Sequence, residues 1–339
     1  MKIATHQELC CPLCQQAMTL RIAEDNGDEV IAGQLVCSQC GEEYPINKRL
    51  PDLIPRTRTE ATKLREMDGW VNLWEKKGMY AHPTLEDSFR LPYVGGIWTE
   101  NARMFDLALD ELQLRGGETT LDVGAGQGWA SRYFAAHGAN AYAIDIVADE
   151  WYGLGRAWSI MEYAGVYFEP MLADGERLPF PSGHFDVVFF SAALHHFERP
   201  ETVLKQMYRV LKPGGRLIAA GEPAISIFVR EQDVQAILEE VDEGIIERRP
   251  KPHDYRRYLE KAGFTDIQLD SYGTYCGDAD EIRKWIKSES QRMVKVVRTR
   301  YKPVAWAMPY VMRLLPARVA GRLLIEIFGA NLFIRARRP

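Results

Sequence analysis

The sequence lacks the features of a membrane-spanning, secreted or strongly basic protein. It contains no run of about 18 apolar residues, so we expect no single helix that spans a bilayer. Residues 1–10 lack the basic flank and apolar core of a secretory signal, and we therefore expect a cytoplasmic protein. The net charge of -5 and the pI of about 5.9 argue against a surface coated in basic residues for nucleic acid.

The composition is that of a globular protein with one or two domains. The 339 residues are 46% hydrophobic and 26% charged, which excludes a disordered chain, a collagen-like chain and a small disulfide scaffold. Charge is unevenly placed, because residues 283–339 hold fourteen Lys or Arg and only two acids, Glu289 and Glu326. This basic lobe predicts either an anionic partner or docking onto the acidic remainder of the chain.

Five of the six cysteines lie in the first 40 residues. Cys11 and Cys14 form one C-x-x-C pair, and Cys37 and Cys40 form a second pair after a gap of 22 residues. In a reducing compartment, two such pairs supply the four sulfur ligands that structural Zn²⁺ prefers; the alternative is a set of buried or redox-active thiols. Cys10 adjoins the first pair without matching its spacing, so we interpret it as a bystander.

The cysteine module, residues 1–56, resembles the zinc-ribbon proteins that partner and activate methyltransferases. The segments that carry the resemblance are CPLC at 11–14, CSQC at 37–40, EYPI at 43–46 and PDLIP at 51–55. A site with four cysteine ligands has no open coordination position. The resemblance therefore implies a Zn²⁺ ion that supports the fold of the module and takes no part in chemistry.

A glycine loop joins a buried strand to a helix near the middle of the chain. TTLDV at 119–123 runs into GAGQG at 124–128, and glycines at such a turn let a ligand approach the backbone closely. The G-x-G-x-G spacing differs from the dinucleotide fingerprint. Asp122, two residues before the first glycine, would repel a pyrophosphate but suits a cationic amino-acid ligand. No G-K-[S/T] follows, which excludes a P-loop.

Two further acids follow predicted strands. Asp145 ends the strand at 141–144, where a carboxylate would accept hydrogen bonds from both hydroxyls of a ribose. Asp174 ends a third strand, where it would bond an adenine amino group. Short β-rich runs alternate with helical stretches across residues 101–222, which is the pattern of a parallel sheet covered by helices.

Residues 121–222 resemble the class I S-adenosylmethionine-dependent methyltransferases, and within them the group that includes the quinone-biosynthesis enzymes. The resemblance implies an α/β fold: a doubly wound, Rossmann-like sheet of seven strands with the last strand antiparallel. The core with its N-terminal cap then occupies 57–275. Residues 276–328 form a basic helical insertion, a lid or substrate wall, and 329–339 hold the final strand.

The resemblance also implies which residues bind S-adenosylmethionine. The glycines would pass close to its methionine part, Asp122 would hold its amino group, Asp145 its ribose and Asp174 its adenine. The predicted cofactor-binding residues are Asp122, Gly124, Gly126, Gly128, Asp145, Ile146, Asp174, Gly175 and Ser191.

Methyl transfer from a sulfonium requires alignment of the reacting atoms, and a general base only where the acceptor carries a proton of high pKa. His195 and His196, just past the fourth strand, are the candidate catalytic bases; the alternative is a structural role. Glu222 is a weaker candidate. Five aromatic residues before the core either cap the sulfonium or pack in the interior. They are Trp70, Trp74, Tyr80, Tyr93 and Trp98.

The sequence thus predicts a methyltransferase that acts on a small-molecule or lipid-linked acceptor. Residues 301–328 mix aromatic and aliphatic side chains with arginines, which suits a helix at an anionic membrane surface; the alternative is a lid helix packed on the core. Two other functions stay open. The basic lobe favours an RNA methyltransferase, although the acidic remainder makes nucleic acid the less favoured partner. A non-catalytic scaffold is the second, and the intact acids and glycines disfavour it.

Overall fold

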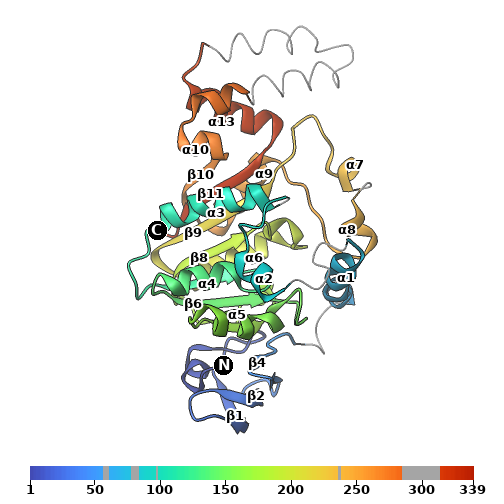
Figure 1. Ribbon diagram of the computed structural model, residues 1–339, viewed down its shortest axis with the longest axis vertical. Helices are drawn as coiled ribbons and strands as arrows, with labels where there is room; N and C mark the ends of the chain where they lie inside the picture. Colours follow the sequence, from blue (N-terminus) through green and yellow to red (C-terminus); the bar gives the residue numbers. More distant parts are fainter. Residues whose placement is uncertain (56–60, 78–83, 97, 236–237, 285–313) are drawn as a thin grey trace.

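The computed structural model describes residues 1–55, 61–77, 84–96, 98–235, 238–284 and 314–339. A small N-terminal module lies at one end of the molecule, and a seven-stranded sheet with helices on both faces fills the middle (Figure 1). Helix α13 (Ala317–Phe328) lies at the end far from the module.

The central sheet has the strand order β10-β11-β9-β8-β5-β6-β7. Neighbours from β9 to β7 pair in parallel, whereas β11 runs antiparallel between β9 and β10. The predicted doubly wound sheet with an antiparallel last strand is therefore confirmed. The strands are β5 (Thr119–Val123), β6 (Asn140–Asp145), β7 (Glu169–Leu172), β8 (Phe185–Ser191), β9 (Leu211–Pro223), β10 (Thr265–Asp270) and β11 (Asn331–Arg337).

Each face of the sheet is buried under its own set of helices. In β8, Val188 and Phe190 belong to the same hydrophobic cluster as α6 and α9, whereas Val187 and Phe189 belong to the cluster of α3, α4 and α5. Because neither face meets water, β8 is a continuous apolar run rather than an alternating one. The helices are α3 (Trp98–Leu112), α4 (Trp129–Ala136), α5 (Ala157–Ala164), α6 (Pro200–Val210) and α9 (Pro252–Ala262).

The N-terminal module is an antiparallel sheet that shares its hydrophobic core with the larger domain. After its last strand, the chain pairs with the outer edge of the large sheet. Asp52 forms a parallel bridge with Leu172, and the Leu53 N–H donates to the Leu172 carbonyl at 2.8 Å. Edge β7 is thereby covered, which protects it from pairing with another chain. The module contains η1 (Ile3–Glu8), β1 (Met18–Asp25), β2 (Val30–Cys37), β3 (Glu43–Asn47) and β4 (Leu50–Pro51).

Helices α1 (Ala61–Lys77) and α8 (Glu239–Asp242) pack against each other beside the sheet (Figure 1). A Cβ on Gly69 of α1 would lie 2.4 Å from the carbonyl oxygen of Glu243, so only glycine permits this close approach. Lys76 Nζ lies 3.1 Å from the Glu243 carboxylate and adds an ion pair. The remaining elements are α2 (Leu85–Arg90), α7 (Glu231–Gln235), α10 (Tyr272–Cys276), η3 (Leu154–Arg156), η4 (Gly175–Arg177) and η5 (Leu194–His196).

The structure differs from the sequence prediction at the third strand. Strand β7 ends at Leu172, because Asp174 instead caps η4 by accepting a hydrogen bond from the Glu176 N–H at 3.0 Å. In the predicted insertion, α13 buries Leu324 and Ile325 against the core, while residues 301–310 lie outside the described residues. The division of the chain at residues 56, 275 and 328 stays a prediction. In the described part of the chain, no helix is both long and apolar enough to cross a membrane.

Candidate active site and metal centre

The glycine loop connects β5 to α4 in a conformation that needs glycine. Gly124, Gly126 and Gly128 all have positive φ, from 56° to 81°. A Cβ on Gly124 would lie 2.8 Å from the Ala193 Cβ, whereas a Cβ on Gly126 would meet no atom within 4 Å. Gly128 has another role, because a Cβ there would lie 2.6 Å from the ring of Phe168. Gly126 thus faces open space, whereas Gly124 and Gly128 permit close contacts with Ala193 and Phe168.

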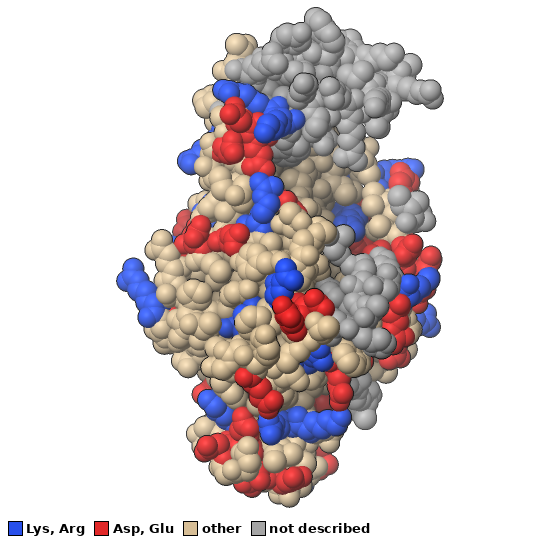
Figure 2. Space-filling view, in the orientation of Figure 1, with Lys and Arg blue, Asp and Glu red and all other residues tan. Residues whose placement is uncertain are grey.

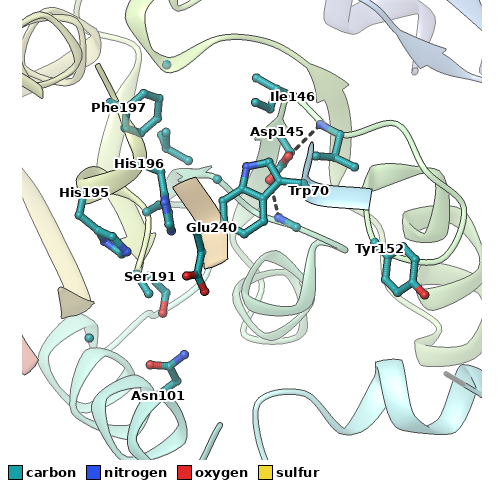
Figure 3. A pocket seen from close by; sticks show the side chains of 18 of the residues that line it. Trp70, Asn101, Asp145, Ile146, Tyr152, Ser191, His195, His196, Phe197 and Glu240 are labelled. Carbon is teal, nitrogen blue, oxygen red and sulfur yellow. Dashed lines mark hydrogen bonds between the residues drawn. The ribbon is translucent and has the colours of Figure 1, made fainter. Parts of the chain in front are cut away.

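Asp145 fixes the glycine loop from the end of the neighbouring strand. Its carboxylate accepts hydrogen bonds from the Gly126 N–H at 2.7 Å and the Val147 N–H at 2.9 Å (Figure 3). Burial raises the pKa of Asp145, and the backbone N–H groups oppose this shift. A carboxylate has about four acceptor positions, so two remain for hydroxyl groups of a ligand.

Asp122 lies beneath the loop and not in the cavity wall. Its carboxylate accepts hydrogen bonds from the backbone N–H and the hydroxyl of Ser131 in the first turn of α4, at 3.2 and 2.9 Å. Burial raises the pKa of Asp122 to about 7. The structure therefore places Asp122 where it holds the start of α4, at the positive end of the helix dipole.

A cavity of about 600 Å³ opens at the carboxyl ends of the strands. Its size falls within the range of small-molecule sites. Six of the nine predicted cofactor-binding residues line it, together with both candidate histidines, whereas Asp122, Gly128 and Asp174 do not. The six are Gly124, Gly126, Asp145, Ile146, Gly175 and Ser191. Their roles stay predictions.

His195 is held by a buried carboxylate. Its Nδ1–H donates to Glu222 Oε2 at 3.1 Å, and both side chains are almost fully buried. Glu222 also accepts hydrogen bonds from the backbone N–H groups of Ala193, Leu194 and His195 and from the Tyr255 hydroxyl. Glu222 thus fixes the turn of η5 and leaves His195 Nε2 as the other ring nitrogen, 3.8 Å from Glu247 Oε1 and beyond hydrogen-bond distance of it.

His196 has a different environment. Its Nδ1 lies 2.9 Å from the Ile246 carbonyl and 3.0 Å from a Glu247 carboxylate oxygen. Arg249 forms a second ion pair with Glu247.

Burial and the neighbouring His196 lower the pKa of His195. Burial also acts to lower the pKa of His196, but Glu247 and the Ile246 carbonyl raise it overall. His195 is therefore the ring that stays neutral near pH 7 and can accept a proton.

Helix α1 forms the wall opposite the strand ends. Trp70 and Trp74 stack with their ring centroids 6.0 Å apart, and Trp70 meets His196 edge to face at 4.7 Å. Both tryptophans and Trp98 line the cavity, and Figure 3 shows Trp70 in front of Asp145. Tyr93 instead packs on Tyr133 and donates to Asp106, away from the cavity. Tyr80 lies outside the described residues.

Sequence reasoning missed several residues of the cavity wall. Lys63 and Glu66 form a buried ion pair at 2.9 Å on α1. Lys63, Glu66 and Trp70 are three and four residues apart, and all three line the cavity. That periodicity is a usable signal for one helix face. Glu247 and Arg249 come from a loop without periodic pattern, so the sequence offered no indication of their place.

The four cysteines of the two C-x-x-C pairs form one cluster. The Sγ atoms of Cys11 and Cys40 lie 3.6 Å apart, and those of Cys14 and Cys37 lie 3.4 Å apart. Sulfurs about 2.3 Å from a tetrahedral Zn²⁺ lie roughly 3.8 Å from one another, so the cluster fits zinc after a small expansion. The Tyr44 hydroxyl lies 3.2 Å from Cys11 Sγ, where it can donate to a thiolate.

Cys10 lies outside the cluster. Its thiol donates to Gln15 Oε1 at 3.3 Å, and it is not among the residues whose sulfurs gather.

Comparison with known proteins supports both parts of the chain. Residues 121–219 match the family model of the methyltransferase domain, and residues 2–48 match that of the Trm112p-like proteins. The resemblances stated from the sequence are thereby confirmed: the chain contains a methyltransferase domain and a Trm112p-like module.

Among curated proteins, the chain is similar to the ubiquinone/menaquinone biosynthesis C-methyltransferase of Ectopseudomonas mendocina. The two are 35% identical over 107 residues, which are 31% of this chain and 42% of that protein. The same enzyme from Pseudomonas putida is 27% identical over 169 residues, covering 42% of this chain and 66% of that protein. The chain spans less than half the length of the first curated relatives that it matches.

Among solved structures, the fold is similar to that of phosphoethanolamine N-methyltransferase 2 from Haemonchus contortus. The TM-score is 0.51 with 15% sequence identity, and the alignment covers 88% of this chain and 62% of that one. This similarity supports the fold alone.

We expect one equivalent of zinc per chain in elemental analysis of the purified protein, because the clustered cysteines supply the four sulfur ligands that structural Zn²⁺ prefers. Cys37→Ser should lose the metal, since three sulfurs and a hydroxyl bind Zn²⁺ more weakly. Cys10→Ser serves as the matched control and should retain it. Loss of zinc from the Cys10 variant, or metal-free wild type with a folded module, would contradict the assignment.

Proposed function

We propose that the protein binds S-adenosylmethionine in the cavity and transfers its methyl group to a small-molecule acceptor. The observation that carries this proposal is the gathering of Gly124, Gly126, Asp145 and Ser191 around one cavity, at the carboxyl ends of β5, β6 and β8. In doubly wound sheets this edge is where ligands bind.

The cavity fits the cofactor in polarity as well as size. Ser191 Oγ is buried and has no hydrogen-bond partner among the described residues, so it is free to bond a ligand. Gly126 leaves its backbone open, and Asp145 keeps acceptor positions for ribose hydroxyls. When bound, S-adenosylmethionine supplies an electrophilic methyl group on a positively charged sulfur.

His195 is the residue we propose as the general base. Glu222 holds its Nδ1–H, so Nε2 is the nitrogen available to take a proton from an acceptor. Helices α1 and α8 and the tryptophan pair exclude water from the reacting atoms, and His196 stays paired with Glu247.

The charges of the cavity favour an acceptor without phosphate groups. Five carboxylates and two cations are among the described lining residues. A phosphorylated acceptor would meet net negative charge in this wall, whereas a neutral or cationic small molecule would not. The carboxylates are Glu66, Glu100, Asp145, Glu240 and Glu247, and the cations are Lys63 and Arg249.

An RNA acceptor is the second candidate, and the Trm112p-like module is the observation that favours it. On the face shown in Figure 2, however, the described cations and acids are interspersed and form no broad basic field on that face. A protein that bound RNA through phosphate contacts would need such a field, and its affinity would fall steeply with salt.

We also propose a role for the N-terminal module, called the ribbon below. It holds in place residues 172–179, the segment of the cavity wall that contains Gly175. Cys10 N–H donates to the Pro179 carbonyl at 3.0 Å, and Gln15 Nε2 donates to the Leu178 carbonyl at 3.3 Å. Leu53 binds Leu172 on the other side, so the ribbon fixes both ends of the segment that contains Gly175. Cys10 and Gln15 flank zinc ligands, which connects the metal to the cavity wall.

Asp145→Asn should weaken S-adenosylmethionine binding by roughly 10- to 150-fold in calorimetry, the effect of losing a charged hydrogen-bond partner worth about 1.5–3 kcal/mol. Glu150→Gln is the matched control, because Glu150 lies exposed in the following loop and does not line the cavity. Equal affinity of wild type and the Asp145 variant would refute the cofactor site.

Glu222→Gln should lower the pKa of His195 further, because the Glu222 carboxylate raises that pKa by its charge and its hydrogen bond. Imidazole titration by ¹H–¹⁵N NMR measures this without knowledge of the acceptor. With His195 as the base, methyl transfer should decline only at pH values below the ordinary histidine pKa of about 6.5. Glu100→Gln, on another part of the wall, should leave the titration unchanged. An unaltered His195 pKa in the Glu222 variant would show that the pair does not act together.

Removal of zinc by a chelator should weaken cofactor binding. Without the metal, the turn around Cys11 and Cys14 would lose its fixed shape, and the hydrogen bonds to the Leu178 and Pro179 carbonyls would break. Two hydrogen bonds of about 1 kcal/mol each correspond to roughly a 30-fold rise in Kd. Calorimetry before chelation, after it and after return of Zn²⁺ measures the effect. Unchanged affinity in the zinc-free protein would show that the ribbon does not support cofactor binding.

A further inference from the structure

Exposed apolar side chains gather around helix α13. Ten large hydrophobic residues are exposed in the described part of the chain. Four of them lie on α13 or on the turn that touches its end: Ile227, Phe228, Val319 and Leu323, which are 41–56% exposed. Single exposed hydrophobic residues are common on protein surfaces, but a contiguous group marks an interaction site.

Helix α13 shows two different sides. Ala320, Leu324 and Ile325 are buried where the helix packs on α9, α10 and β10. On the exposed half, residues four apart form two parallel stripes, one apolar and one charged. The apolar stripe is Val319, Leu323 and Ile327, and the charged stripe is Arg318, Arg322 and Glu326.

The turn after β9 extends the apolar stripe beyond the end of the helix. The Ile227 N–H and the Ser226 hydroxyl both donate to the Ile327 carbonyl, at 3.1 and 2.8 Å. Ile227 and Phe228 are thereby fixed beside the last turn of α13. Lys251 Nζ lies 3.4 Å from the Ile227 carbonyl and adds a cation at this end.

The charge of this surface is positive. We call Ile227, Phe228, Lys251, Arg318, Val319, Arg322 and Leu323 the α13 face. Arg322 lies 3.7 Å from the Asp270 carboxylate, which also binds Arg335, so the arginine keeps most of its exposure. Glu326 lies 3.9 Å from Arg256, which offsets the one acid in the charged stripe.

We propose that the α13 face docks on the surface of an anionic membrane. An amphipathic helix with arginines beside an apolar stripe lies in the lipid interface: its apolar side chains enter the headgroup boundary and its cations meet anionic lipids. Phe228 at the end of the stripe adds an aromatic side chain. The proposal is independent of methyl transfer, because it uses no residue of the cavity.

Charge complementarity selects a membrane over the other occupants. In a twofold dimer through this face, both copies would bring the same positive net charge into one desolvated interface. Nucleic acid would satisfy the arginines but leave the apolar stripe in water. An anionic lipid surface satisfies both stripes at once.

Co-sedimentation of the full-length protein with vesicles tests the proposal. We expect binding to phosphatidylglycerol-containing vesicles at low ionic strength, weaker binding at high salt, and little binding to pure phosphatidylcholine. Arg318→Gln should weaken binding by roughly fivefold, the contribution of one cation near an anionic surface. Leu323→Ser should weaken it as well, because it interrupts the apolar stripe.

Matched controls come from the N-terminal module, at the other end of the molecule. Arg21→Gln and Ile22→Ser change an exposed cation and an exposed apolar residue there, and should bind as wild type does. Far-ultraviolet circular dichroism confirms that each variant is folded, which all four exposed substitutions permit.

Three results would overturn the proposal. The first is protein that stays in the supernatant with anionic vesicles at low salt. The second is binding that the α13 variants and the module controls weaken equally. The third is a wild-type dimer in light scattering that Leu323→Ser converts to a monomer, which would assign the face to self-association. Because S-adenosylmethionine binding is measured separately, failure here leaves the proposed function intact.

Discussion

The carboxyl ends of five parallel strands lie on the same side of the central sheet. The chain must turn back after each strand without leaving buried N–H groups unpaired. Three acids at strand ends meet this constraint. Asp122 accepts from Ser131, Asp145 accepts from Gly126 and Val147, and Glu222 accepts from three consecutive N–H groups that begin at Ala193. The cavity is the space that these fixed turns leave between them.

The number of hydrogen-bond donors around each carboxylate sets the direction in which its pKa is shifted. Burial raises the pKa of Asp122 to about 7, because only Ser131 stabilises its charge. Burial acts on Glu222 as well, but His195 and the backbone N–H groups more than offset it, so the pKa of Glu222 lies below its ordinary value. Two carboxylic acids of one sheet thus differ in charge. Only Glu222 carries a charge that would stabilise a protonated His195, the base that we propose.

The sequence predicted those parts of the structure that depend on local pattern. The apolar runs indicated the strands, and the glycine spacing indicated the loop, because backbone conformation limits which residues fit there. It did not separate Gly128 from Gly124, since the contact with Phe168 comes from a distant part of the chain. Glu247 came from a loop whose position depends on the packing of α1 and α8, which no local pattern specifies.

The additions to the core lie at the two edges of its sheet, and edge strands are where a sheet is open to unwanted pairing. The ribbon covers β7 through Asp52 and Leu53, and α13 packs beside β10, where Arg322 approaches the buried Asp270. The N-terminal module pairs with outer strand β7, whereas α13 packs beside β10, and each brings a new surface to that side of the sheet. The N-terminal module brings a cysteine cluster to the segment that contains Gly175, whereas α13 brings an exposed apolar stripe to the far end. The contacts with an outer strand therefore fix the position of each addition. The exposed side chains on its outward side remain available to bind another molecule.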